Sequence, residues 1–199
     1  MTNRRLDDVL GEKMRLVYES GGGARKWWPT AYVVREFTKF LKNHFAGRND
    51  LVGVELGVFT GCNGESIYDY LKDQLKFLGE IDSWEGCGET DDAQLEHLVE
   101  TYFLLKGKKK IVIIKGWSKE VSQIFGPIFD FAYVDSSHTM VEVTWDFEVW
   151  YPLVKPGGVF GGHDYVQVKA AVDKFFEGKN VDITLGSAAD WWIIKGEQK

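Results

Sequence analysis

Short apolar runs alternate along the chain with longer segments in which apolar residues recur three or four positions apart. The runs have the length and the Val, Ile, Leu and Phe content of buried strands. They occupy residues 51–56, 77–81, 111–114, 129–134 and 159–162. Strands buried on both faces belong to parallel sheets, because the crossover helices cover both faces of such a sheet. The pattern therefore predicts a parallel sheet.

Helical spacing marks most of the intervening segments. Residues 32–41, which follow Pro29, and residues 91–105 and 168–176 fit helices, and Asn63 and Ser118 are candidate caps for two more. Residues 140–150 fit a strand as well as a helix; we predict a helix, since two parallel strands need a crossover between them. Residues 181–185 and 191–194 read as closing strands.

This alternation predicts an α/β fold. We expect a Rossmann-like, doubly wound, mostly parallel seven-stranded sheet with an antiparallel C-terminal strand. We expect a single domain over residues 1–199, with an N-terminal arm and helix at 1–46, a candidate lid, and a cofactor-binding and catalytic core at 47–199. The pair Trp27–Trp28 either fixes the arm to the core or belongs to that lid.

Composition narrows the function. A net charge of −6 argues against nucleic acid as the main partner. No stretch approaches 18 apolar residues and no signal peptide is evident, so we expect no membrane association. Cys62 and Cys87 form neither a metal motif nor a disulfide framework, which predicts a cytoplasmic location.

The turn after the first strand predicts a binding site for an anionic group. Gly57 and Gly61 allow the backbone to approach a ligand closely, and Asn63 can cap the following helix. The N-terminus of a helix attracts anions. The spacing Gly-x-x-x-Gly lacks the middle glycine of the dinucleotide fingerprint, which argues against NAD.

Polar residues also follow the other predicted strands. In a parallel sheet the carboxyl ends of the strands meet at one rim, and ligands bind there. The residues that we expect at this rim are Glu55, Asp82, Ser118, Asp135, His163 and Asp164. Five consecutive strands thus deliver polar groups to one edge.

Five motifs together give the chain a resemblance to class I S-adenosylmethionine-dependent methyltransferases. They are the segments Glu-Leu-Gly-Val-Phe-Thr-Gly at 55–61, Ile-Asp-Ser-Trp at 81–84, Lys-Gly-Trp-Ser at 115–118, Tyr-Val-Asp-Ser-Ser-His at 133–138 and Pro-Gly-Gly with Gly-His-Asp-Tyr at 156–165. The chain is most similar to the small metal-dependent O-methyltransferases, which comprise the catechol-type enzymes and a group acting on sugars and natural products. The resemblance covers about residues 50–165.

The resemblance implies a role for each matching residue. The cofactor would be S-adenosyl-L-methionine, with Glu55, Gly57, Phe59, Gly61 and Asn63 around its methionine part. Asp82 would bind the ribose, Trp84 would flank the adenine, and Trp117 and Ser118 match adenine-contacting positions. Asp135 is implied in both cofactor and metal binding. With His163 and Asp164 it would hold a divalent cation, Mg²⁺ or Mn²⁺; the family has Asp-Asn at the last two positions, so the histidine is a departure.

His138 matches the position of the family's catalytic lysine. Transfer of a methyl group from sulfonium to oxygen needs a deprotonated hydroxyl, and a neutral imidazole can accept that proton near pH 7. We therefore expect His138 and Asp135 to act in catalysis. The alternatives are that His138 is a metal ligand or is bonded to backbone, and that Asp135 and Asp164 are capping residues.

The expected reaction is a metal-assisted O-methylation of a small molecule. A sugar or natural product is favoured as the acceptor, because several tryptophans could stack on a ring. The protein could also form a homo-oligomer, which the sequence does not decide. The alternatives are a non-catalytic nucleotide- or sugar-binding module, and an NAD-linked oxidoreductase.

Overall fold

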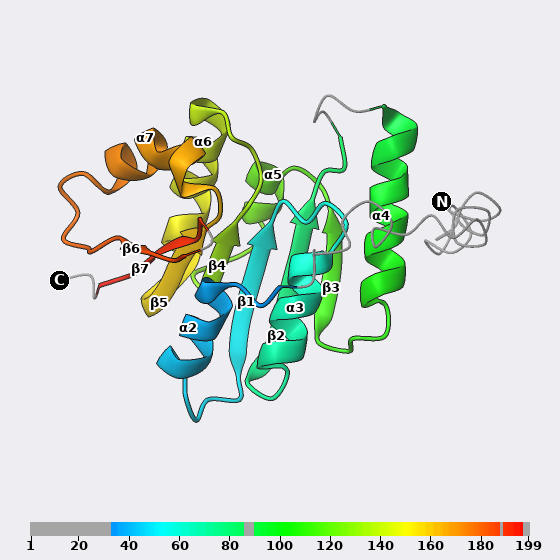
Figure 1. Ribbon diagram of the computed structural model, residues 1–199, viewed down its shortest axis with the longest axis horizontal. Coiled ribbons are helices and arrows are strands. Elements are labelled where there is room, and N and C mark those ends of the chain that lie inside the picture. Colours follow the sequence, from blue (N-terminus) through cyan, green and yellow to red (C-terminus); the bar gives the residue numbers. More distant parts are fainter. Residues whose placement is uncertain (1–32, 86–89, 188, 197–199) are drawn as a thin grey trace.

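The computed structural model describes residues 33–85, 90–187 and 189–196. Pro29, the pair Trp27–Trp28 and Cys87 lie outside these residues. Within them the chain alternates between strands and helices and forms one central sheet (Figure 1).

The sheet has seven strands in the order β3-β2-β1-β4-β5-β7-β6. The strands are β1 (Leu51–Leu56), β2 (Leu75–Asp82), β3 (Ile111–Lys115), β4 (Phe129–Val134), β5 (Val154–Gly162), β6 (Thr184–Leu185) and β7 (Trp191–Ile194). The first five pair in parallel, and β7 runs antiparallel to both β5 and β6. This confirms the predicted mostly parallel sheet with its antiparallel C-terminal strand.

Helices cover both faces of the sheet (Figure 1). They are α2 (Glu36–His44), α3 (Cys62–Leu71), α4 (Asp91–Leu105), α5 (Ser118–Ser122), α6 (Met140–Trp150) and α7 (Tyr165–Phe176). Apolar side chains of α2 and α3 pack on one face, and those of α5, α6 and α7 pack on the other. Phe37 and Leu41 of α2 are fully buried, so the described part of the N-terminal region belongs to the core.

Threonine caps explain where two of the predicted helices begin. Thr90 Oγ1 accepts a hydrogen bond from Ala93 N–H at the start of α4, and Thr139 Oγ1 accepts one from Glu142 N–H at the start of α6. Such caps satisfy donors that have no partner within the helix. The ambiguous segment 140–150 is a helix, as the need for a crossover predicts.

Several local predictions are wrong. Neither Asn63 nor Ser118 is a cap, because Gly61 and Trp117 occupy those positions, and the helix that begins at Ser118 ends at Ser122. Both side chains instead hydrogen-bond to acidic groups elsewhere, Asn63 to Glu55 and Ser118 to Asp146.

The strand predictions also need correction, in the burial of one strand and in the bounds of three others. The run 111–114 is an edge strand with Val112 exposed rather than a buried strand, because only β2 pairs with it. β5 begins at Val154 rather than at residue 159, and β2 begins at Leu75 rather than at residue 77. The predicted strand 181–185 is reduced to two residues.

Candidate active site

The turn after β1 is held in an unusual backbone conformation. Gly57, Phe59 and Gly61 have φ values of 82°, 54° and 81°. A Cβ on Gly57 would lie 2.3 Å from the Asp135 carbonyl oxygen, so only glycine lets this turn approach the end of β4. The turn leads directly into the N-terminus of α3, which suits an anionic ligand group.

Asp82 is the side chain that fixes this turn. Its Oδ2 accepts hydrogen bonds from Val58 N–H at 2.8 Å and Phe59 N–H at 2.9 Å, and its Oδ1 accepts one from Trp84 N–H at 2.7 Å. A carboxylate offers about four lone pairs, so one acceptor position remains for a ligand hydroxyl. Asp82, which was predicted to bind the ribose, therefore also holds the backbone of the turn in place.

The aromatic residues near the turn differ in exposure. Trp84 is 6% exposed, and its Nε1–H donates to the Phe59 carbonyl oxygen at 2.8 Å. Phe59 and Trp117 are 43% and 48% exposed. The open aromatic surface at this part of the rim thus belongs to Phe59 and Trp117, while the ring of Trp84 packs inside against Val58 and Leu98.

A buried carboxylate that the sequence reading missed joins two rim segments. Asp146 of α6 is 6% exposed and accepts hydrogen bonds from Ser118 Oγ and Ser136 Oγ. Burial raises the pKa of the Asp146 carboxyl, and the two hydroxyl bonds oppose that rise. The available signal was an acidic residue on the apolar side of the predicted helix, between Val143 and Phe147.

Asp135, His138 and Asp164 come together as a candidate metal centre. One ligand atom from each lies within 4.8 Å of the other two. His138 Nε2 is 2.8 Å from Asp164 Oδ2. Oxygen and imidazole nitrogen donors at this separation fit a divalent cation. Asp164 lies at the N-terminus of α7 with a φ of 52°, a left-handed conformation that turns the chain at the rim.

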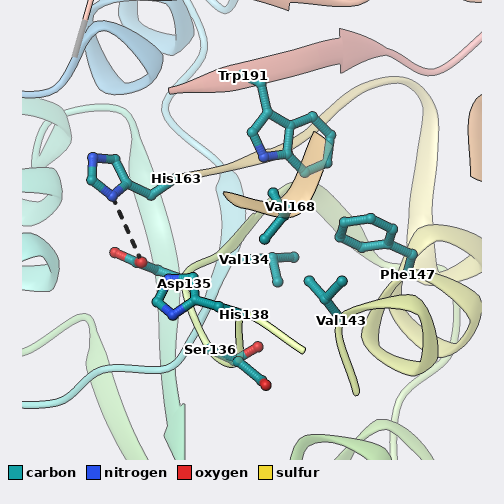
Figure 2. A pocket seen from close by; sticks show the side chains of 10 residues that line it. Val134, Asp135, Ser136, His138, Val143, Phe147, His163, Val168 and Trp191 are labelled. Carbon is teal, nitrogen blue, oxygen red and sulfur yellow. Dashed lines mark ion pairs between the residues drawn. The ribbon is translucent and has the colours of Figure 1, made fainter. Parts of the chain in front are cut away.

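His163 was predicted as a ligand but lies outside this group. Its Nδ1 is 3.2 Å from Asp164 Oδ1. The same Nδ1 is 3.9 Å from Asp135 Oδ1 (Figure 2). The two histidines therefore flank the same pair of aspartates. His138 belongs to the group of ligand atoms that lie within 4.8 Å of one another, and His163 does not. The sequence alone could not show which of the two histidines would join the aspartates.

The two aspartates differ electrostatically. Burial raises the pKa of Asp135, although Arg35 and His163 oppose the rise. For Asp164, burial also acts upward, but the hydrogen bond with His138 and the charge of His163 leave the pKa below its usual value. Asp164 is the more readily ionised of the two, which favours cation binding.

Arg35 completes the site from the residue before α2, and no sequence signal pointed to it. Its Nη2 lies 3.2 Å from Asp135 Oδ2, and its Nη1 donates to the Tyr133 hydroxyl at 2.6 Å. That hydroxyl donates in turn to Asp190 Oδ1 at 2.8 Å. Burial lowers the pKa of Arg35, but the surrounding Tyr133, Asp135, Glu55 and Asp190 raise it above its usual value. Arg35 thus orients Asp135 and neutralises buried acid.

Glu55, predicted to contact the cofactor, is 1% exposed and faces a second carboxyl group. Glu80 pairs with it in register on β2 and is fully buried. Glu55 Oε1 accepts a hydrogen bond from Asn63 Nδ2 at 2.8 Å. Burial raises the pKa of Glu55 to about 7, and burial together with the Glu55 charge raises the pKa of Glu80 well above its usual value. The signal that the sequence offered was an acid inside an apolar strand.

A small pocket of about 10 Å³ is lined by Asp135 and His138 of the candidate metal centre and by apolar side chains (Figure 2). Its inner wall is formed by Val134, Val143, Phe147, Val168 and Trp191. A space of this size holds about one water molecule. A ligand larger than a water molecule therefore does not fit inside this pocket.

None of the helices in residues 33–85, 90–187 and 189–196 combines the length and the apolar character that a membrane span needs.

A family model described as "Methyltransferase domain" matches residues 54–165. This range includes the glycine turn, Asp82, Asp135 and Asp164. Comparison with curated protein sequences found no match.

Solved structures with the same fold include three enzymes. The first is described as a caffeoyl-CoA O-methyltransferase from Staphylococcus aureus, with 15% identity, a TM-score of 0.61 and 96% of each chain covered. The O-methyltransferase NovP has 16% identity and a TM-score of 0.58, with 81% of this chain and 79% of that chain covered. The MycE methyltransferase, in complex with Mg, SAH and mycinamycin VI, has 16% identity and a TM-score of 0.56 over 81% of this chain and 50% of its own length. At these identities the likeness establishes the fold.

Proposed function

Because the chain belongs to the methyltransferase-domain family and is a class I S-adenosylmethionine-dependent methyltransferase, we propose that it methylates a hydroxyl oxygen of a small molecule with the help of a divalent cation. The observation that supports the cation is the group formed by Asp135, His138 and Asp164 beside the glycine turn. Two relatives of the same fold point the same way, since NovP is an O-methyltransferase and MycE was solved with Mg and SAH.

The cofactor would lie across the carboxyl ends of β1, β2 and β3. The turn from Gly57 to Gly61 and the N-terminus of α3 fit its carboxylate, since a helix N-terminus binds anions. The remaining acceptor position on Asp82 fits one ribose hydroxyl, and Phe59 and Trp117 offer exposed rings to the adenine. Three residues would stabilise the turn without contacting the cofactor through their hydrogen-bonded groups, because those groups already bind protein atoms: Glu55, Asn63 and Trp84.

We assign the cation, Mg²⁺ or Mn²⁺, to Asp135, Asp164 and His138, with His163 as the group that accepts the proton. When bound, the cofactor supplies an electrophilic methyl group and the cation orients the acceptor hydroxyl and lowers its pKa. The aspartates then hold the reacting group in place, and an imidazole beside them removes the proton. This exchanges the two histidine roles expected from the resemblance, because Asp135, His138 and Asp164 each offer one ligand atom within 4.8 Å of the other two, and His163 is not part of that group.

The first experiment tests the cofactor and the cation. Calorimetry should show binding of S-adenosylhomocysteine and none of NAD, and turnover should stop with EDTA and return with Mn²⁺. Asp164→Asn should abolish Mn²⁺ binding, whereas the exposed Asp173→Asn on α7 serves as a matched control and should leave it unchanged. Wild-type protein that binds no S-adenosylhomocysteine, or that turns over fully without cation, would contradict the proposal.

The second experiment separates the histidines. His138→Ala should weaken Mn²⁺ binding at least about tenfold, as expected when a ligand is lost. His163→Ala should keep Mn²⁺ affinity and lose about 10²-fold or more in kcat, which is the usual contribution of a general base. The opposite pattern would restore His138 as the base.

The acceptor class is proposed as a sugar or natural-product hydroxyl. A panel of sugars, catechols and polyketide glycosides, assayed for methyl transfer with Mn²⁺ present, tests this directly. A single domain over residues 1–199, the lid role of the N-terminal arm, a homo-oligomer and a cytoplasmic location stay predictions. Light scattering of the purified chain measures the oligomeric state.

A further inference from the structure

Asp146 links the segments that follow β3 and β4 through a single buried carboxylate. Ser118 Oγ donates to its Oδ1, and Ser136 Oγ donates to its Oδ2 at 2.5 Å. Asp146 is 6% exposed, whereas both serines are half-buried. The carboxylate is therefore hidden from a ligand, while the two serines that it binds are only partly covered.

The pairing fixes the polarity of each hydroxyl. An ionised carboxylate accepts hydrogen bonds and donates none, so each serine must direct its only proton toward Asp146. The hydrogen bonds from the two hydroxyls favour this ionised form. What remains on Ser118 Oγ is a lone pair, and a ligand group can meet it favourably only by donating a hydrogen bond.

Strand order places Ser118 near the base of the cofactor. This step rests on the proposed function, in which the ribose binds at Asp82. Asp82 and Lys115 are paired neighbours on β2 and β3, and Ser118 lies three residues after Lys115. A purine attached to a ribose at Asp82 therefore extends over the end of β3 toward Ser118.

We propose that Asp146 is a positioning residue that makes this site select a 6-aminopurine over a 6-oxopurine. The exocyclic amine of adenine donates to the lone pair on Ser118 Oγ. In S-inosylhomocysteine an oxygen replaces that amine, and two acceptors then face each other. N1 also changes from an acceptor in adenine to an N–H donor in hypoxanthine, so the polarity of the hydroxyl is read from the change in discrimination between wild-type protein and the Asp146 and Ser118 variants. A site built to bind one polar group rejects the mismatched analogue strongly.

The test is calorimetry at pH 7.5 with S-adenosylhomocysteine and S-inosylhomocysteine. Wild-type protein should bind the adenine compound at least about 100-fold more tightly, in line with other hydrogen-bond mismatches. Asp146→Asn should reduce this ratio at least about tenfold, because the amide can donate to Ser118 and reverse its hydroxyl. Ser118→Ala should reduce the ratio as well, and the matched Ser136→Ala should preserve it.

The outcomes separate this inference from the proposed function. If wild-type protein binds neither compound, the methyltransferase assignment fails with it. If S-adenosylhomocysteine binds but the ratio is unchanged in both Asp146→Asn and Ser118→Ala, the cofactor site stands and the inference is overturned. Circular dichroism shows whether Asp146→Asn folds; where it does not, Ser118→Ala decides alone, since loss of one hydroxyl leaves the buried carboxylate its other donor.

Discussion

Replacing Glu55 by glutamine is expected to make the free energy of unfolding less dependent on pH. In the folded protein, burial raises the pKa of Glu55 from 4.5 to about 7. A group whose folded pKa is raised contributes stability that is complete below its unfolded pKa and is lost as the pH rises through the folded pKa. The relevant window therefore runs from about pH 4.5 to about pH 7.

The size of the effect follows from the same shift. At about 1.36 kcal/mol per pKa unit, a rise from 4.5 to about 7 corresponds to about 3 kcal/mol. Of this, about 2–3 kcal/mol is lost between pH 5 and pH 8.5. Glutamine has the same shape, keeps an acceptor for Asn63 Nδ2 and does not titrate, so the variant escapes this loss.

Urea unfolding at pH 5 and pH 8.5, followed by tryptophan fluorescence, measures the effect. The stability of Glu55→Gln relative to wild type should rise by about 2–3 kcal/mol from the lower to the higher pH. Ionisable groups that do not interact with Glu55 cancel in this comparison. The pKa of Glu80 is raised in part by Glu55, so its loss of that contribution in the variant acts in the same direction. Glu148→Gln on the exposed side of α6 is the matched control. A change below about 1 kcal/mol would mean that Glu55 ionises equally easily in the folded and unfolded chain, and would refute the reasoning.

Three further substitutions test the packing around the site. Arg35→Ala should cost about 2–4 kcal/mol of unfolding free energy, because it removes the cation that the described part of the chain places beside the fully buried Asp190. A cost below about 1 kcal/mol would show that the hydrogen bond from Tyr133 is enough to stabilise Asp190. Lys195→Met should cost about 1–3 kcal/mol in urea unfolding, since Nζ donates to three backbone carbonyl oxygens after α6; an equally stable variant would show that water replaces it. Thr139→Ala should cost about 1 kcal/mol through the lost cap of α6, and thermal unfolding unchanged from wild type would contradict this.

Local pattern determined the architecture. The apolar runs predicted the five parallel strands, because a strand buried on both faces consists mainly of apolar residues. The rim followed from the same regularity: parallel strands joined by crossovers all end at one edge. Asp82, Asp135 and Asp164 could therefore be placed together from the sequence, although they are separated by dozens of residues.

Helix and strand ends were less determinable. Asn63 and Ser118 have the chemistry of caps, yet each bonds to a carboxylate that the fold brings near. The isolated segment favours a cap because the backbone offers the nearest donors. A hydrogen bond to a charged carboxylate is stronger than one between the side chain and a backbone N–H, and only the packed structure brings the carboxylate within reach.

Tertiary structure alone decided the partners within the site. Whether His138 or His163 joins the two aspartates in one group of ligand atoms depends on how the segments after β4 and β5 fold over the rim. The Glu55–Glu80 pair depends on the register of β1 against β2, and the contact of Arg35 with Asp135 joins positions 100 residues apart. Sequence periodicity records which face of an element a residue occupies, but not which residue of another element it meets. The distances that turn these polar residues into a candidate active site arise only when the chain packs.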